Sequence, residues 1–436
     1  MTNTLAILGG RPVREAPFPS RRTMGEAEKR AVLEVMDSDC ISGFLGSPGE
    51  GAWGGPKVRQ FEEIWADRFG YRHAVTVNSW TSGLTVAIAS AGLGPGDEMI
   101  CPPYTMSASS TAALFYGVVP VFADIDPRTF CLDPASVESR ITPRTKAIMA
   151  VHLFGGSADL DALYQIADRH GLRVIEDAAQ APGTTWKGKY VGGMRDLGGF
   201  SLNYHKHIHT GEGGVIVTND DDLALRAKLI RNHGENFIES LGLENLTNIV
   251  GGNYRLTELQ AAIGIAQLDR LDDILVTRRA LASHLARRLS DIPGLTSAHE
   301  APDTQHAYYV YPIRFDPEVI GLDRKTFIEA VSAELPMPGI PEDIPLSGGY
   351  VKPLYLNPVY QKRIAIGSRG FPFNYPGAVA PEYGKGLCPV AERMHESELM
   401  ISFLVREPMT TKDIDDFADA MQKVVENAHL ISCATA

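Results

Sequence analysis

Val174-Ile-Glu-Asp-Ala-Ala-Gln180 has the pattern of a buried β-strand that ends in a carboxylate, Asp177. The stretch Gly199-Phe-Ser-Leu-Asn-Tyr-His-Lys-His-Ile-His-Thr-Gly-Glu-Gly-Gly214 places Lys206 before a tight glycine turn. A lysine can form a Schiff base, and an acid can keep a pyridine nitrogen protonated so that its ring accepts electrons. The two stretches together therefore suggest a pyridoxal phosphate site.

Around these stretches, short apolar strand candidates alternate with helix candidates. The strand candidates are 74–78, 98–101, 118–124, 147–152, 173–177 and 213–218. Stretches with helical periodicity lie between them, at 82–91, 158–170 and 223–231. This alternation predicts an α/β fold with a mainly parallel sheet flanked by helices, and ligands gather at the carboxyl ends of the strands in such folds.

The pattern divides the chain into an N-terminal arm and helix over 1–55, a large domain over 56–270 and a smaller α+β domain over 271–436. Residues 257–289 have apolar residues at helical spacing and no proline, which predicts one long helix leaving the large domain. Residues 334–383 are rich in proline, glycine and tyrosine. They predict a long ordered loop of the kind that often determines specificity.

Composition excludes several classes of function. The net charge of the 436 residues is −12 at pH 7, which argues against nucleic acid or an anionic membrane surface as the main partner. The five cysteines include no CxxC pair, so we expect reduced thiols, no zinc site and a cytoplasmic protein. The N-terminus has no export signal, and no apolar run approaches the length of a membrane span.

Four ordered segments together resemble the DegT/DnrJ/EryC1/StrS family of pyridoxal phosphate-dependent sugar aminotransferases. They are Asn78-Ser-Trp-Thr-Ser-Gly-Leu-Thr85, the stretch at 174–180, the stretch at 200–214 and Gly252-Asn-Tyr-Arg-Leu-Thr-Glu-Leu-Gln-Ala-Ala262. The resemblance implies a fold-type-I aminotransferase that binds pyridoxal 5'-phosphate, with pyridoxamine 5'-phosphate as the intermediate form of the cofactor. It also implies a homodimer with shared active sites.

The resemblance assigns three residues to the cofactor ring. Lys206 matches the Schiff-base lysine, which also moves a proton during the reaction. Asp177 matches the acid that pairs with the pyridinium nitrogen, and its alternative role is a helix cap. Gln180 matches the residue that hydrogen-bonds the phenolic oxygen of the cofactor, with an ordinary polar helix position as the alternative.

Phosphate binding is predicted at the first helical turn after Asn78, where free backbone N–H groups and the helix dipole favour an anion. Thr81 and Ser82 are the candidate hydroxyls there, and Ser201 is a further candidate by resemblance. Asn253 and Arg255 match the segment that family members lend to the neighbouring subunit, where the asparagine reaches the phosphate. Without the resemblance, Arg255 would be interpreted as a surface residue at the start of a helix.

Two positions depart from the family pattern. Trp80 replaces a glycine in the phosphate-binding turn, and Met106 stands where an aromatic residue usually stacks on the cofactor ring. Met106 keeps a polarizable sulfur for that contact, and Tyr104 is a second candidate. The alternating His205, His207 and His209 favour a polar rim of the cofactor site over a metal site.

The resulting hypothesis is a ping-pong aminotransferase that moves an amino group from glutamate or glutamine to a keto sugar or keto-cyclitol, in amino-sugar or aminocyclitol biosynthesis. The alternative acceptor is a nucleotide-linked keto sugar, whose diphosphate would contact Lys352, Arg363 or Arg369. A keto-sugar dehydratase is disfavoured because Lys206 is present. A non-catalytic cofactor sensor is disfavoured because no basic DNA-binding region is visible.

Overall fold

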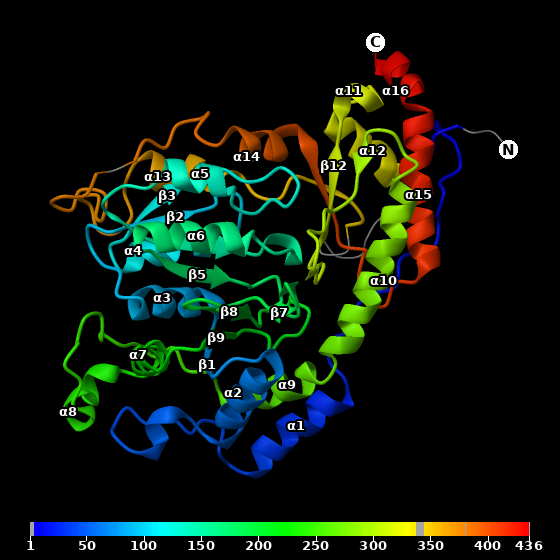
Figure 1. Cartoon of the computed structure of the whole chain (residues 1–436). Helices are drawn as coiled ribbons and strands as arrows, with labels where there is room; N and C mark the ends of the chain where they lie inside the picture. The colour runs from blue at the N-terminus through cyan, green and yellow to red at the C-terminus, as the bar shows by residue number, and fades with distance from the viewer. Residues whose placement is uncertain (1–3, 337–343, 380, 436) are drawn as a thin grey trace.

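The structure is a computed structural model that describes residues 4–336, 344–379 and 381–435, apart from the side chains of residues 432–435. Two sheets organise it, one large and one small (Figure 1). The large sheet has seven strands in the order β1-β9-β8-β5-β4-β2-β3. They are β1 (His73–Val77), β2 (Glu98–Cys101), β3 (Val119–Phe122), β4 (Thr145–Val151), β5 (Arg173–Asp177), β8 (Leu197–Ser201) and β9 (Gly214–Thr218).

The predicted α/β fold with a mainly parallel sheet is confirmed. Strands β8, β5, β4, β2 and β3 run parallel, whereas β9 is antiparallel to both β8 and β1. Four of the five residues of β5 are buried, as expected for a strand covered by helices on both faces. Asp177 is the last residue of this strand, so the fold brings its carboxylate to the edge of the sheet where ligands are expected.

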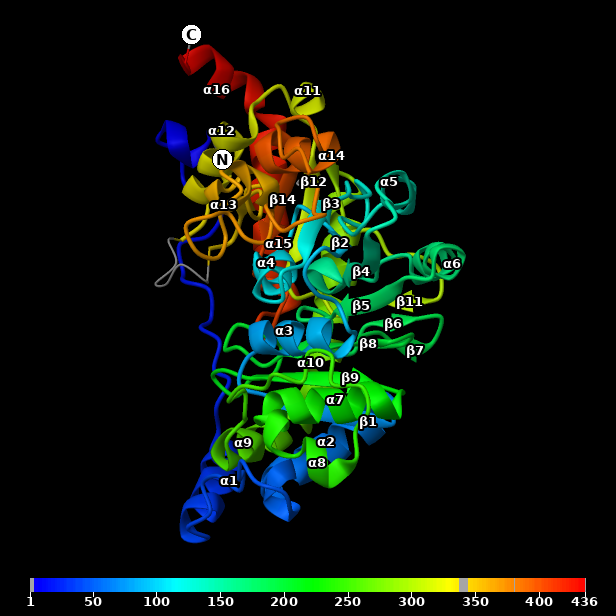
Figure 2. The same cartoon turned by 90° about the vertical axis from the view of Figure 1, so that its left-hand side faces the viewer.

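Helices cover both faces of the large sheet. Figure 2 shows α3 (Trp80–Ser90) and α4 (Ala108–Phe115) on one side of β4 and β5, and α6 (Leu160–His170) on the other. The side chains of Ser79 and Asp159 accept backbone hydrogen bonds at the starts of α3 and α6, so N-capping fixes where these helices begin. The remaining helices of this region are α1 (Glu26–Asp37), α2 (Pro56–Phe69), α5 (Pro134–Ser139), α7 (Asp221–Arg231), α8 (Ile238–Leu241) and α9 (Glu258–Leu268).

A small antiparallel sheet and its helices form a second hydrophobic core. Its strands run in the order β10 (Leu295–Thr296), β12 (Tyr311–Phe315), β14 (Leu399–Ser402) and β13 (Ser347–Gly348). The helices of this part are α10 (Leu271–Leu289), α11 (Pro317–Ile320), α12 (Arg324–Ala333), α15 (Thr411–Glu426) and α16 (Ala428–Thr435). A three-stranded sheet of β11 (Thr304–Gln305), β6 (Thr185–Trp186) and β7 (Lys189–Tyr190) lies beside the large sheet (Figure 2). The domain boundary near residue 270 stays a prediction.

The single helix predicted over 257–289 is wrong. The chain forms α9 and α10, with a break at Asp269–Arg270. Gln267 Nε2 and Arg270 Nη1 both donate to the carbonyl oxygen of Thr23, at 2.8 Å and 2.6 Å. The N-terminal arm therefore contacts the chain at this break, which periodicity alone does not reveal.

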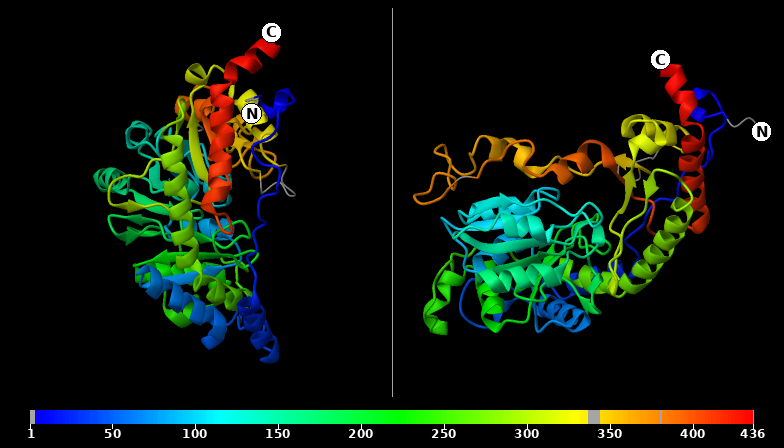
Figure 3. Two further views of the ribbon diagram at one scale, coloured as in Figure 1. Left: turned by 90° about the vertical axis from the view of Figure 1, so that its right-hand side faces the viewer. Right: turned by 45° about the horizontal axis from the view of Figure 1, so that its top comes forward.

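The proline-rich segment runs along the outer edge of the large sheet (Figure 3, right). Residues 337–343 and 380 of the predicted loop lie outside the described residues. Elsewhere Tyr383 OH donates to Pro120 O at 2.6 Å, and Tyr360 OH lies 2.6 Å from Ser110 Oγ. The short helix α13 (Pro358–Gln361) interrupts the segment, and α14 (Pro389–Arg393) follows it. No helix among the described residues is long and apolar enough to cross a membrane.

Candidate active site

A cavity of about 380 Å³ opens at the carboxyl ends of β4, β5 and β8, next to the N-terminus of α3. Six of the predicted site residues line it: Thr81, Met106, Asp177, Gln180, Ser201 and Lys206. Ser82, Asn253 and Arg255 do not line it. The fold therefore brings the strand carboxylate and the lysine, which are 29 residues apart, to one cavity.

Asp177 is buried at the floor of the cavity and accepts three hydrogen bonds. Trp80 Nε1 donates to Oδ1 at 2.7 Å, and Ser109 Oγ donates to Oδ2 at 2.7 Å. The backbone N–H of Ala179 also donates to Oδ1, at 3.2 Å. Such donors stabilise the ionised form of a buried carboxylate. The alternative role of Asp177 as a helix cap does not apply, because a turn and not a helix follows β5.

Lys206 lies in the turn after β8, opposite Asp177 in the cavity. Its Nζ is 4.3 Å from the centroid of the Tyr309 ring, and the amine has no hydrogen-bond partner within the described part of the chain. Burial lowers the pKa of Lys206 to about 8, although the charge of Asp177 acts in the opposite direction. A lysine with a pKa near neutrality is a better nucleophile and base than a solvated one.

Two tyrosines of the cavity were not predicted from the sequence. Tyr350 OH accepts a hydrogen bond from Gln180 Nε2 at 2.9 Å, while Gln180 Oε1 accepts one from Phe154 N at 2.7 Å. Tyr309 lies beneath the lysine amine. Both tyrosines come from parts of the chain beyond residue 300. The one sequence signal for Tyr350 is its place after Gly348-Gly349 in the predicted specificity loop.

The start of α3 keeps its turn despite the tryptophan. Ser79 Oγ caps the helix by accepting from Ser82 N at 3.1 Å. Ser82 Oγ donates to Asn78 Oδ1 at 2.7 Å, so this hydroxyl is used within the turn, whereas Thr81 lines the cavity. Ser201 Oγ accepts from Asn203 N at 3.3 Å and also lines the cavity. An anion at the start of α3 would meet the backbone N–H groups of its first turn and two hydroxyls.

Asn253 and Arg255 lie outside the cavity of their own chain. The side chain of Arg255 donates to Asn232 Oδ1 at 2.7 Å and lies over the Phe44 ring. Asn253 is exposed, and its carbonyl oxygen accepts from Asn78 Nδ2 at 3.3 Å. Their predicted role in a neighbouring site stays a prediction.

Met106 and His205 line the cavity, whereas His207 and His209 do not. Met106 lines the cavity with 53% of its surface exposed, and its sulfur accepts from Ala108 N at 3.0 Å. Tyr104 is fully buried, and its OH accepts from the backbone N–H of Tyr350 at 2.8 Å. His207 Nε2 contacts Ala307 O at 2.8 Å, and His209 Nε2 contacts Thr23 Oγ1 at 2.7 Å. These two histidines therefore bind the surrounding chain.

Comparison with known proteins identifies the family. The model of the DegT/DnrJ/EryC1/StrS aminotransferase family matches residues 25–374. The chain belongs to this aminotransferase family. The predicted recognition and the predicted class of enzyme are thereby confirmed. Membership of the family implies a pyridoxal phosphate cofactor.

Several relatives of this aminotransferase are named for a cyclitol or a sugar. An L-glutamine:scyllo-inosose aminotransferase of Streptomyces griseus is 36% identical over 441 residues, covering 99% of this chain and 100% of that protein. A GDP-perosamine synthase of Caulobacter vibrioides is 42% identical over 288 residues, 66% of this chain and 74% of that protein. The X-ray structure of an aminotransferase from Psychrobacter cryohalolentis is 29% identical with a TM-score of 0.79, and covers 95% of this chain and 100% of that one. The predicted fold is confirmed by the solved structures. The predicted function in amino-sugar or aminocyclitol biosynthesis agrees with these relatives.

Proposed function

We propose that this aminotransferase uses pyridoxal phosphate to move an amino group from glutamine or glutamate to the ketone of a cyclitol or sugar. The observation that carries the proposal is the pairing of Lys206 with Asp177 across one cavity that also reaches the start of α3. A lysine, a buried acid and an anion-binding helix start are the three groups that this cofactor needs.

The residues of the cavity fit the cofactor in their chemistry. The amine of Lys206 would bind its aldehyde carbon, Asp177 its pyridine nitrogen and Gln180 its phenolic oxygen. Thr81 and Ser201, with the first N–H groups of α3, would hold the phosphate, and Ser82 would support that turn. When bound, pyridoxal phosphate supplies an electron sink that lets a proton leave the carbon next to the transferred nitrogen.

Lys206 would then move that proton. With a pKa of about 8, about one lysine in ten is unprotonated at pH 7, so the residue can both accept and return a proton. The ring of Tyr309 keeps the amine inside the cavity by a cation–π contact when it is charged. The three donors hold the Asp177 carboxylate in place, where its charge balances the positive charge of the site.

The acceptor that we favour is a free keto-cyclitol or keto sugar. The relative from Streptomyces griseus, named for scyllo-inosose, aligns with nearly the whole chain, including the proline-rich segment. Lys352, Arg363 and Arg369 do not line the cavity of their own chain within the described residues, and Arg363 Nη2 pairs with Glu382 at 2.9 Å. A nucleotide diphosphate would therefore find none of the three predicted cationic contacts there.

We also propose a cytoplasmic homodimer that completes the site. Met106, which lines the cavity, and Tyr204, which lies between the lining residues Asn203 and His205, are 53% and 49% exposed. Apolar side chains exposed together are typical of a protein interface. Asn253 and Arg255 lie outside their own cavity and would serve the partner's. The cytoplasmic location rests on the cysteine usage alone.

The direct test is to add L-glutamine or L-glutamate to the protein loaded with pyridoxal phosphate and to follow the absorbance of the bound cofactor. Conversion to the pyridoxamine form is expected, followed by its reversal on adding scyllo-inosose. An unchanged spectrum would instead indicate a sensor. If only a GDP-linked keto sugar reversed the change, the acceptor would be nucleotide-linked.

Shared sites are tested by mixing two inactive variants, Lys206→Ala and Asn253→Ala, after dissociation and reassociation. If Asn253 serves the neighbouring site, each mixed dimer contains one intact site, and random mixing restores about a quarter of the native activity. If Asn253 serves its own site, mixing restores nothing. The mass of the native protein in solution, measured by analytical ultracentrifugation, shows independently whether it is a dimer.

A further inference from the structure

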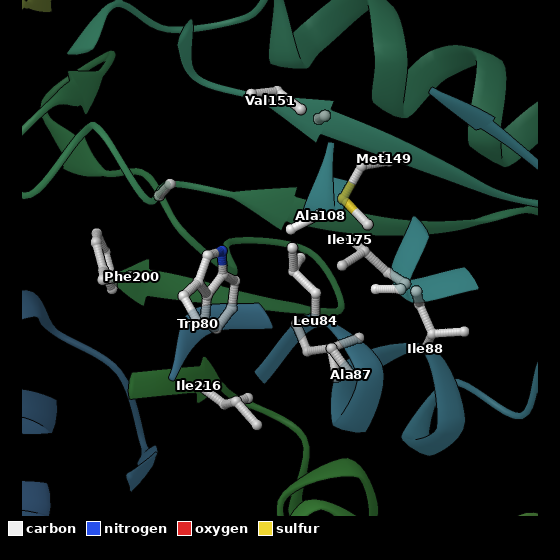
Figure 4. Close-up of a cluster of buried hydrophobic side chains, with 14 of the residues drawn as sticks. Trp80, Leu84, Ala87, Ile88, Ala108, Met149, Val151, Ile175, Phe200 and Ile216 are labelled. Carbon is white, nitrogen blue, oxygen red and sulfur yellow. The ribbon is translucent and has the colours of Figure 1, made fainter. Parts of the chain in front are cut away.

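Trp80 is one of the two residues lining the cavity that depart from the family pattern. It occupies the first position of α3, yet only 5% of its surface is exposed. Figure 4 shows its indole among Leu84, Phe200 and Ile216, with the nitrogen on the side away from Ile216. That nitrogen donates to Asp177 Oδ1 at 2.7 Å.

The surrounding backbone provides space for the indole. A Cβ atom added to Gly83 would lie 2.5 Å from Trp80 Cε3, and one added to Gly199 would lie 2.6 Å from Trp80 Cη2. Real side chains do not approach that closely, so a larger residue at Gly83 would displace the ring, and one at Gly199 would meet both the ring and the backbone oxygen of Val215, at 2.0 Å. The tryptophan is therefore accommodated by glycines in both α3 and β8.

An indole N–H can only donate, so its partner must offer a lone pair. The Asp177 carboxylate accepts from Trp80, Ser109 and Ala179, so its plane is fixed at both oxygens. Because Asp177 must remain an anion in order to pair with a protonated pyridine nitrogen, the direction of these hydrogen bonds matters for the cofactor. Resting on the function proposed above, we propose that Trp80 is a positioning residue that orients the Asp177 carboxylate for that nitrogen.

The test measures cofactor binding to the apoprotein, apart from turnover. Trp80→Phe keeps an aromatic ring and removes the N–H group, and we expect it to weaken the affinity for pyridoxal phosphate about tenfold, as is typical of losing a hydrogen bond to a charged group. In the Asp177→Asn background the same substitution should change the affinity less than about twofold, because the charge it acts on is gone. An equal effect in both backgrounds would mean that Trp80 acts through packing alone and would overturn the proposal.

Trp186 provides a matched control. Its Nε1 donates to Asp161 Oδ1 at 2.9 Å, which is the same type of pair outside the cavity. Trp186→Phe is therefore expected to leave the cofactor affinity unchanged. If it weakened the affinity as much as Trp80→Phe, the effect would not belong to the site.

A spectroscopic measurement covers the case in which Trp80→Phe does not fold. The chain has four tryptophans, so the apoprotein labelled with ¹⁵N-tryptophan gives four indole N–H signals. Trp→Phe variants of the other three assign their signals, and the signal that is left belongs to Trp80. Asp177→Asn should move the Trp80 signal and leave the Trp186 signal in place; an unmoved Trp80 signal would overturn the proposal. This result needs no cofactor. If the native protein did not bind pyridoxal phosphate, the proposed function would fail separately from the Trp80–Asp177 contact.

Discussion

Asp177 and Lys206 face the same cavity, but different parts of the molecule hold them. Asp177 ends a strand in the middle of the large sheet, and its donors belong to α3, α4 and the turn after β5. Lys206 lies in a turn whose backbone carbonyls, Lys206 O and His207 O, accept from Arg21 of the N-terminal arm at 3.0 Å and 2.9 Å. The acid is thus positioned by its own sheet and the lysine by distant segments.

Those segments are joined by a buried ion-pair cluster. Glu407, which follows β14, accepts from Arg21 at 3.0 Å and lies 3.4 Å from Arg278 of α10. Tyr309, which precedes β12, supplies the ring beneath the lysine amine. The difference indicates a rigid acid and a lysine whose position depends on the arm and the small sheet. Such a dependence suits a lysine that must first bind the cofactor, then release it and then carry a proton.

The largest expected effect comes from the lysine itself. Lys206→Ala removes both the nucleophile and the proton carrier, so we expect transaminase activity to fall at least about 10³-fold. Lys206→Arg is the control, because it keeps the positive charge but not the nucleophile. The measurement is the initial rate of keto-acid release from glutamine. Native turnover by either variant would contradict the proposed role.

A smaller loss of activity is expected from a substitution of Asp177, the rigidly held acid. Asp177→Asn keeps the shape of the side chain and removes the charge, so we expect the rate to fall about 10²-fold, as is typical when a charge-stabilising group is lost. Urea unfolding of the apoprotein is the control, since the amide oxygen of Asn can still accept from Trp80 and its NH2 group can donate to Ser109 Oγ. A rate within about threefold of the native rate would show that the pyridine nitrogen does not need the carboxylate.

The sequence predicted the position of Asp177 well, because the strand that carries it is a local feature. β5 is a buried apolar run that ends in Asp177, and the motif around Lys206 consists of β8 and the turn after it. The segment at 174–180 therefore carries both the strand and its functional end. Even Trp80, which stood out as a departure, lies at the expected helix start; only its hydrogen bond to Asp177 was unforeseen.

The lysine side was largely missed, because its partners are far away in the chain. Arg21, Tyr309 and Tyr350 reach the site only after the small sheet and the arm have packed against the large sheet. No periodicity or motif links residue 21 to residue 206. The break between α9 and α10 was missed for the same reason, since its contacts go to Thr23 of the arm.

Arg21 allows the dependence on distant segments to be measured. Arg21→Ala breaks a largely buried ion pair and two hydrogen bonds to carbonyl groups, so we expect the free energy of unfolding to fall by about 2 kcal/mol and kcat by about tenfold. Arg21→Lys keeps the charge but not the forked donors. It should restore much of the stability and little of kcat. Equal recovery of both would show that the arm does not position Lys206.

The smallest expected effect is the influence of the Asp177 charge on the pKa of Lys206. Burial lowers the pKa of Lys206 from 10.5 to about 8, and Asp177 opposes that shift, so Asp177→Asn should lower this pKa further. In the apoprotein, an amine-specific reagent should then label Lys206 a few times faster at pH 7, with the midpoint below 8. Mass spectrometry of the labelled peptide gives this rate, and labelling of the exposed Lys325 controls for the reagent.

The same shift gives the sign of a stability change with pH. The unfolded chain keeps the proton of Lys206 up to about pH 10.5, whereas the folded apoprotein releases it near pH 8. Between these values the unfolded state binds more protons, so the contribution of Lys206 makes the apoprotein more stable as the pH rises. Asp177→Asn should extend this window to lower pH. A labelling midpoint that moved above 8 would mean that the two groups do not face each other, and the comparison between the two sides of the cavity would fail.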